Sequence, residues 1–326
     1  MLLALLLVTA ITIVRLRNIF AVVVMGGIYS LLMAVTFTVL DAVDVAFTEA
    51  AVGAGVTTVL GLAALSLTTY RERIPAHRPW LPMIVVIVTG MVLIYAIPDM
   101  PAFGDGSAPV HTHVAPRYFE ETPQAIGIPN IVTAILADYR GFDTLGEAFV
   151  IFTAGIGVLL LLARGRHMAR GRRKGGERKR SEDGMSDFLV LRVVSKVLIP
   201  FILLFGLYVQ MHGDYGPGGG FQAGVIIAAA FILYGLVFGL DALERAAPQR
   251  IVLACVGLGV VVYTAVGLLT IGLGGSFLDY ALLAPDPAAG HHYGIFAVEI
   301  GVGITVAAVM LTAFATFAAR GEESDD

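Results

Sequence analysis

Three glutamates inside long apolar runs are the residues best placed to do chemistry: Glu49 in DVAFTEAAVGAG, Glu147 in GFDTLGEAF and Glu299 in YGIFAVEIGVGI. A charge in the middle of a bilayer costs about 2.5–3.5 kcal/mol on insertion scales, so an intramembrane carboxylate is a functional candidate by default. Carboxylates buried between helices can bind and release protons near neutral pH. Alternatively, an acidic residue near a helix N-terminus only complements the helix dipole at the interface.

Small residues surround each glutamate and favour the first interpretation. Gly53 and Gly55 follow Glu49, while Gly146 and Ala148 flank Glu147; Ala297, Gly301 and Gly303 lie around Glu299. Small residues mark close helix packing in membranes, which predicts that the glutamates face protein rather than lipid. Asp44 joins them as a pathway candidate; on the second interpretation, Asp44 and Asp143 cap their helices.

Lys196 is the remaining charged candidate, about two turns inside one end of an apolar run. A lysine there either extends its side chain back to the interface or accepts and returns a proton in a buried site.

The stretch HGDYGPGGGF, from His212 to Phe221, is the other distinctive motif. Gly218, Gly219 and Gly220 follow Pro217 directly. Glycines permit backbone conformations and close helix approaches that other residues bar. The motif is therefore either a tight external turn alone or a surface for packing between subunits.

Other chemistry has little support. The sequence has no phosphate-binding Gly-rich loop, nucleophile elbow or zinc-type helix motif. His111 with His113, and His291 with His292, form pairs in predicted external loops; polar loop residues are favoured over a metal site, because no third ligand is suitably spaced. The single cysteine, Cys255, excludes an internal disulfide and a cysteine-built iron–sulfur site. We predict no cofactor and no resident metal, although transient Na+ binding near Glu49 or Glu147 is conceivable.

Composition defines the class of protein. The chain is 57% hydrophobic and 14% charged, and its mean hydropathy is +0.85. Continuous apolar runs of about 20 residues can cross a hydrocarbon core about 30 Å thick, whereas open strands cannot. The sequence predicts an all-α polytopic membrane protein with nine transmembrane helices. These are residues 2–14, 19–40, 45–70, 81–97, 144–162, 188–210, 221–240, 251–271 and 293–317.

Basic residues predict the orientation, because Lys and Arg concentrate on the cytoplasmic side. One side collects Arg15, Arg17, Arg71, Arg73, Arg78, the run RGRHMARGRRKGGERKR, Arg245, Arg250 and Arg320; the other keeps only Arg117 and Arg140. We therefore expect the N-terminus outside and the C-terminus in the cytoplasm, with the protein in the cell membrane. The first apolar run is interpreted as a retained span, since it lacks a basic start and a cleavage site.

Four segments are expected: 1–78 with three spans, 79–165 with two spans and an external loop, a basic cytoplasmic linker at 166–186, and 187–326 with four spans. Contact with anionic lipid explains the linker better than nucleic-acid binding. Within the external loop, IPNIVTAILADYR could form a short amphipathic helix on the surface or packed against the spans.

Three motifs resemble known families. DAVDVAFTEAAVGAG resembles the D-type subunit of membrane-bound hydrogenases (MbhD), which also occurs in the tail of the large Mrp antiporter subunit. ILADYRGFDTLGEAFV resembles the adjoining E-type segment (MbhE), and HGDYGPGGGFQAGVI is similar to the motif of the Mrp B subunit (MnhB). The resemblance covers nearly the whole chain. It makes segment 1–78 MbhD-like, 79–165 MbhE-like and 187–326 MnhB-like.

The resemblance implies an accessory subunit of a multisubunit Na+/H+ antiporter, a transporter rather than an enzyme, with Glu49 and Glu147 on the ion or proton path. Its expected partners are other Mrp-type subunits, including the fourteen-span antiporter-like core absent here, the lipid bilayer, Na+ and H+. Two alternatives stay open: a subunit of a hydrogenase-type redox complex, or a structural scaffold. Val43 stands where the family usually has proline, and residues 214–216 replace a commoner polar triplet.

Overall fold

The computed structural model describes residues 1–72, 80–170 and 189–324 of the chain. These parts are helical apart from short turns and one isolated bridge between Asn18 and Arg71. The predicted linker at 166–186 lies largely outside the described residues. The all-α prediction is confirmed.

Eight helical runs in the described part are long and apolar enough to cross a membrane. They are α2 (Ile19–Val39), the continuous run α3, η1 and α4 (Val43–Glu49, Ala50–Val56, Thr57–Leu65), α5 (Trp80–Ala96) with η2 (Ile97–Asp99), α9 (Gly141–Arg170), α10 (Leu189–His212), α11 (Gly220–Phe238), α13 (Gln249–Gly272) and α14 (Pro287–Ser324). The predicted first span is helix α1 (Leu2–Arg15), whose 14 residues reach only about 21 Å at 1.5 Å per residue. The predicted count of nine spans is therefore eight long helices and one short one.

Four helix ends differ from the predicted spans by five residues or more; two of them are extensions, of α9 to Arg170 and of α14 to Ser324. The third span ends at Leu65 rather than at residue 70. There the chain turns back, and the amide of Ile19 donates to the carbonyl of Tyr70 across 3.0 Å. Helix α14 begins at Pro287, six residues before the predicted start, so His291 and His292 lie in its first turns rather than in a loop.

Short elements connect the long helices. They are α6 (Pro109–Thr112), α7 (Ala115–Ala125), α8 (Ile131–Ala134), η3 (Ile135–Tyr139), α12 (Leu240–Ala246) and η5 (Tyr280–Leu283). The stretch IPNIVTAILADYR forms α8 and η3, and its Ala134 and Ala137 are buried. The hydroxyl of Tyr280 donates to the carbonyl of Ala137 across 3.0 Å. This segment is therefore packed against the spans.

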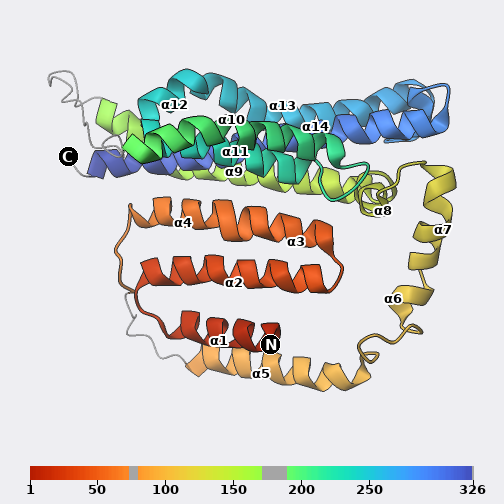
Figure 1. Cartoon of the computed structure of the whole chain (residues 1–326), viewed down its shortest axis with the longest axis horizontal. Helices are drawn as coiled ribbons and strands as arrows, with labels where there is room; N and C mark the ends of the chain where they lie inside the picture. The colour runs from red at the N-terminus through yellow and green to blue at the C-terminus, as the bar shows by residue number, and fades with distance from the viewer. Residues whose placement is uncertain (73–79, 171–188, 325–326) are drawn as a thin grey trace.

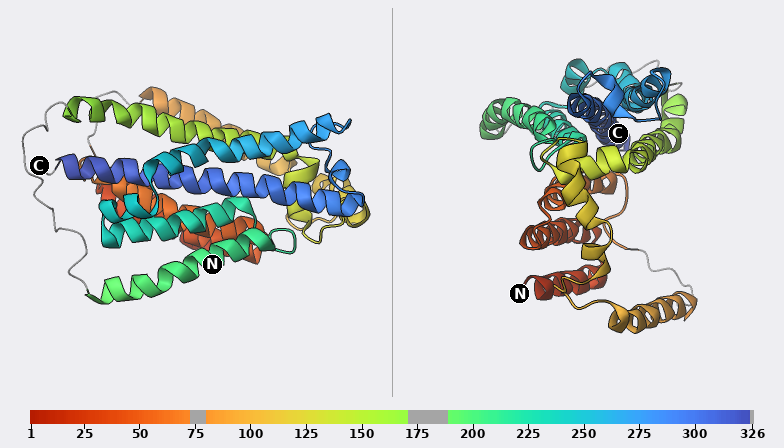
Figure 2. Two further views of the ribbon diagram at one scale, coloured as in Figure 1. Left: turned by 90° about the horizontal axis from the view of Figure 1, so that it is seen from above. Right: turned by 90° about the vertical axis from the view of Figure 1, so that its right-hand side faces the viewer.

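Helix α14 is the central helix of the bundle that it forms with α11, α13 and α9 (Figures 1 and 2). Glycines permit this packing: a Cβ at Gly259 of α13 would lie 2.0 Å from the carbonyl oxygen of Gly301. Buried Tyr263, Ile295 and Phe314 fill the remaining core. Small residues thus let three helices approach α14 closely.

The N-terminal helices form a separate layer beside this bundle, with α3 and α4 nearest to it, then α2 and α1 (Figure 1). Helix α5 lies beyond α1 and has no buried residue within the described chain. Because α5 is apolar all round, only lipid or other membrane helices can cover it.

Helices α3, α9 and α14 all begin at the same end of the molecule, at the right of Figure 1. The three glutamate-bearing helices therefore run the same way, as predicted, while their direction across the membrane stays a prediction. We call this the site end; it also holds α8, η3 and the turn between α10 and α11.

Candidate functional site

The turn between α10 and α11, residues 213–220, is called the glycine loop below. Gly219 has a φ of +115°, a conformation that side-chain-bearing residues rarely adopt. Its amide donates to the carbonyl of Val209 in the last turn of α10 across 3.1 Å. The glycines are thus required by the backbone path of this turn.

Asn130 holds the loop from the opposite side. Its Nδ2 donates to the carbonyls of Gly213 and Gly216, each across 2.9 Å, and its own amide donates to the carbonyl of Asp214 across 3.0 Å. Its Oδ1 accepts the amides of Val132 and Thr133 at the start of α8. One buried side chain therefore caps a helix and fixes a loop more than 80 residues away.

The last glycine of the loop allows α11 to touch α14. A Cβ at Gly220 would lie 1.9 Å from the carbonyl oxygen of Glu299, and one at Gly224 would lie 2.6 Å from the carbonyl oxygen of Gly303. The expectation of close helix approach at this motif is confirmed, and the approaching helix belongs to the same chain.

The Glu299 side chain lies directly against the glycine loop. A Cβ at Gly213 would be 2.8 Å from its Oε2, and one at Gly219 would be 2.9 Å from its Oε1. The Oε2 atom is buried and has no hydrogen-bond partner among the described residues. Buried carboxylates without partners are costly, so this group is a strong candidate for proton or cation exchange.

Asp44 meets the same loop from α3. Its Oδ1 accepts the amide of Gly218 across 3.3 Å. One turn further along α3, the Thr48 hydroxyl accepts from Gln222 Nε2 of α11 across 3.0 Å. Asp44 is not the N-cap residue of its helix, which is Ala42. It lies in the first turn of α3, where a carboxylate also complements the helix dipole, and its carboxylate accepts a hydrogen bond from the glycine loop.

Glu49 is half-buried between α3 and α2. A Cβ at Gly53 would lie 2.6 Å from both Glu49 Oε1 and Ser30 Oγ, so the glycine makes room for the carboxylate. A π-helical segment, η1, begins at the next residue. π-Helical segments are rare in proteins, and those that occur are often found at functional sites.

Glu147 lies elsewhere, on α9. It is exposed within the described chain, and a Cβ at Gly146 would meet no described atom within 4 Å. Of its two small neighbours, Gly146 meets no described atom and Ala148 is buried, so the expectation that Glu147 faces protein rather than lipid stays a prediction. Asp143, predicted as a possible cap, is instead paired with Arg140 across 2.5 Å.

Lys196 is exposed on α10, and its Nζ lies 5.9 Å from the centre of the Phe238 ring. Phe238 is the last residue of α11, so the lysine lies toward the end opposite the site end. The structure of this chain gives it no buried proton-accepting site.

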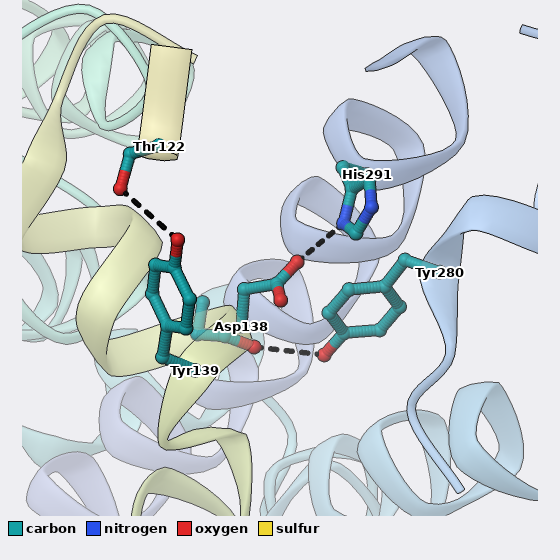
Figure 3. Close-up of polar contacts among 6 residues, drawn as sticks. Thr122, Asp138, Tyr139, Tyr280 and His291 are labelled. Atoms are coloured by element: carbon teal, nitrogen blue, oxygen red, sulfur yellow. Dashed lines mark hydrogen bonds and ion pairs between the residues drawn. The ribbon is translucent and has the colours of Figure 1, made fainter. Parts of the chain in front are cut away.

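Two histidines at the start of α14 pair with carboxylates at the site end. His291 Nδ1 lies 2.5 Å from Asp138 Oδ2 (Figure 3), and His292 Nδ1 contacts Asp214 Oδ2. Burial raises the pKa of the Asp214 carboxyl, and His292 opposes that shift. No group of three or more metal-type side chains occurs within the described ranges.

The structure thus brings some of the predicted site residues together and separates the others. Asp44, Glu299, His212 and the glycine loop meet at the site end, Glu49 lies further along α3, and Glu147 and Lys196 lie apart. Sequence reasoning missed Asn130 and Gln222. The signal for Asn130 was present, since an Asn directly before an apolar helix is a capping signature.

Three family models match successive parts of the chain. Residues 4–70 match the family described as the D subunit of MBH, and residues 83–175 match the family described as the E subunit of MBH. Residues 190–312 match the domain related to the MnhB subunit of Na+/H+ antiporter.

Relatives extend the similarity. The A/B subunit of a K+/H+ antiporter of Rhizobium meliloti is 27% identical over 317 residues, covering 88% of this chain and 31% of the relative. The chain therefore spans about a third of that relative's length. An antiporter subunit mnhB2 of Staphylococcus aureus (strain MRSA252) is 32% identical over 127 residues, covering 38% of this chain and 89% of the relative.

Solved structures give the same picture. A chain of the Mrp complex from Dietzia sp. DQ12-45-1b superposes with a TM-score of 0.74 at 26% identity, covering 97% of this chain and 34% of that one. A chain of the membrane-bound sulfane sulfur reductase, an archaeal respiratory membrane complex, superposes with a TM-score of 0.54 at 29% identity over 72% of this chain and 96% of that one. The chain therefore belongs to the MnhB-related family of multisubunit antiporter subunits, with MbhD-type and MbhE-type segments in the same polypeptide.

Proposed function

We propose that this chain is a membrane subunit of a multisubunit cation/proton antiporter and that Asp44, Glu49 and Glu299 line an ion or proton path through it. The observation that carries the proposal is the meeting of three segments at one point. Asp44 comes from the MbhD-type part, Asn130 from the MbhE-type part, and Glu299 with the glycine loop from the MnhB-type part.

The chemistry of this point suits proton or alkali-cation exchange. Glu299 has a buried oxygen with no partner among the described residues, and Asp44 and Asp214 lie within electrostatic range of it. Carboxylates that crowd one another cannot all be ionised without a counter-charge. A proton or a cation bound there supplies that charge.

The transported cation is Na+ or K+. The matched domain is described by its relation to a Na+/H+ antiporter, and one relative is named for K+/H+ exchange. Both ions prefer oxygen ligands, which carboxylates and the loop carbonyls offer. Glu147 and Lys196 are exposed in this chain. In the proposal, neighbouring subunits cover them and they contribute to the same ion or proton path.

Two alternatives are less well supported. The similarity to the sulfane sulfur reductase supports the first alternative, a subunit of a redox-driven complex. The superposition on the Mrp complex is closer, however, and covers more of this chain. A purely structural scaffold does not account for a buried carboxylate without a partner, such as Glu299. An apolar residue at that position would cost less folding free energy.

Other Mrp-type subunits, including those with the antiporter-like core, are the proposed partners, and the cell membrane is the proposed location. The site end faces the outside in this proposal, since it carries few basic residues. The N-terminus is then outside as well.

Transport by the complex in everted vesicles tests the proposal. A complex with Glu49→Gln should assemble but lose most cation-driven dissipation of the pH gradient, for Na+ and K+ alike. Glu120→Gln, which alters an exposed carboxylate on α7, is the matched control and should leave transport per assembled complex unchanged. Equal transport in both variants would refute a role for Glu49.

A further inference from the structure

The two histidine–carboxylate pairs at the start of α14 differ in their access to water. The His291 and Asp138 side chains are only 14% and 16% exposed. The His292 side chain is 40% exposed, whereas its partner Asp214 is 4% exposed. The pair of His292 and Asp214 therefore connects the surface of the chain to a buried carboxylate. The pair of His291 and Asp138 is largely buried.

Asp214 lies on the glycine loop beside the glycine that contacts Glu299. It directly follows Gly213, at which a Cβ would lie 2.8 Å from Glu299 Oε2. The Oδ1 atom of Asp214 is buried without a hydrogen-bond partner among the described residues, as is Glu299 Oε2. Two buried oxygens without hydrogen-bond partners among the described residues, Asp214 Oδ1 and Glu299 Oε2, thus lie on the loop and on the helix packed against it. The His292 imidazole contacts the other oxygen of Asp214, Oδ2.

From this geometry we propose that His292 and Asp214 form a proton relay that connects the water at the site end to Glu299. The relay rests on the proposed function, because it supplies protons to the path assigned there. It also gives a polar role to Asp214, one of the three residues in which the loop departs from the commoner family motif.

The steps conserve protons. His292 takes a proton from bulk water on one ring nitrogen and donates the Nδ1 proton to the Asp214 carboxylate, which leaves a neutral imidazole and a carboxylic acid. Asp214 then gives its proton, through a bridging water molecule, to the Glu299 carboxylate and returns to its ionised form. Imidazole is suited to this role because its unperturbed pKa lies near physiological pH. Burial raises the pKa of the Asp214 carboxyl, which makes it easier for this group to accept the proton.

The surroundings hold the relay in place. Phe296 stacks against the His292 ring with the centroids 6.4 Å apart, and Asn130 fixes the backbone on both sides of Asp214. Other titratable groups near this loop and the start of α14 come from five elements: Asp44 on α3, His212 on α10, Asp138 on η3, Tyr280 on η5, and His291, Tyr293 and Glu299 on α14.

His292→Ala with chemical rescue tests the relay. The assembled complex should transport protons at least about tenfold more slowly, and imidazole added on the side of the site end should restore much of the rate. Asp214→Asn should show the same loss without rescue, because an amide cannot carry the proton. His291→Ala is the matched control; it loses an equivalent pair and should leave the rate per assembled complex and its pH profile unchanged.

Two results would overturn the relay. One is a wild-type rate and pH profile in His292→Ala together with an inactive Glu299→Gln. That result would refute the relay and support the proposed function. The other is a loss that imidazole does not change and that His291→Ala shares, which assigns both histidines to structure alone. A wild-type complex without any cation-driven proton flux would remove the proposed function and the relay together.

Discussion

The amide of Gly218 donates a hydrogen bond to the Asp44 carboxylate across 3.3 Å, although 174 residues separate the two in the sequence. This contact joins the MbhD-type helix α3 to the glycine loop of the MnhB-type part. It helps to hold the start of α3 and the glycine loop together at the site end, so that the loop lines the proposed path.

Asn130→Ala should destabilise the assembled complex by about 1–3 kcal/mol, because it leaves the buried carbonyls of Gly213 and Gly216 without their donor. Thermal unfolding of the purified complex measures the loss. Asn18→Ala is the control, since the exposed Asn18 side chain caps α2 by accepting the Ala21 amide; its cost should be about 1 kcal/mol or less. Equal shifts in the two variants would contradict the role of Asn130 in holding the loop.

Gly220→Ala should prevent correct packing of α11 on α14, because the new methyl group would lie 1.9 Å from the Glu299 carbonyl oxygen. The yield of assembled complex after mild-detergent purification measures this. Gly272→Ala at the end of α13 should assemble normally, since a Cβ there meets no described atom within 4 Å. Normal assembly of Gly220→Ala would show that the two helices can separate at no cost.

Topology can be tested with two conservative cysteine variants in a background where Cys255 is replaced by alanine. Ser107 lies at the site end, in the segment between η2 and α6, and Ser66 follows α4 at the opposite end; both are exposed. An impermeant thiol reagent applied to intact cells should label Ser107→Cys and spare Ser66→Cys until the cytoplasm is opened. The reverse pattern would invert the proposed orientation.

Glu147 should behave as a path residue only within the complex, because this chain leaves it exposed. Glu147→Asp should keep part of the transport, whereas Glu147→Gln should abolish it with assembly intact. If Glu147 only complements the dipole of α9, the amide costs about 0.3–1 kcal/mol of stability. Transport per assembled complex would then be unchanged.

Sequence patterns predicted the long helices well, because a continuous apolar run of sufficient length has few alternatives in a membrane. Helix ends were harder. The third span was extended to residue 70 because residues 66–70 carry no charge, while the bridge between Asn18 and Arg71 requires a turn there. The first span was predicted on hydrophobicity, and only its length distinguishes it from the others.

The candidate site was only partly predictable. Gly53 correctly marked a carboxylate packed between helices, whereas Gly146, with the same sequence logic, faces open space. Local sequence does not say which helix covers a given face. The partners of His291 and His292 lie 153 residues away at Asp138 and on the glycine loop at Asp214, so these pairs exist only in the folded chain. The π-helical segment after Glu49 likewise has no sequence signature.

Proton transport by Glu299 variants tests the central claim most directly. Cation-driven collapse of the pH gradient is measured in vesicles and normalised to assembled complex. Glu299→Gln, which keeps the shape of the side chain but cannot exchange a proton, should abolish transport, and Glu299→Asp should retain part of it. Wild-type transport by Glu299→Gln in a fully assembled complex would contradict the assignment of this carboxylate to the ion path.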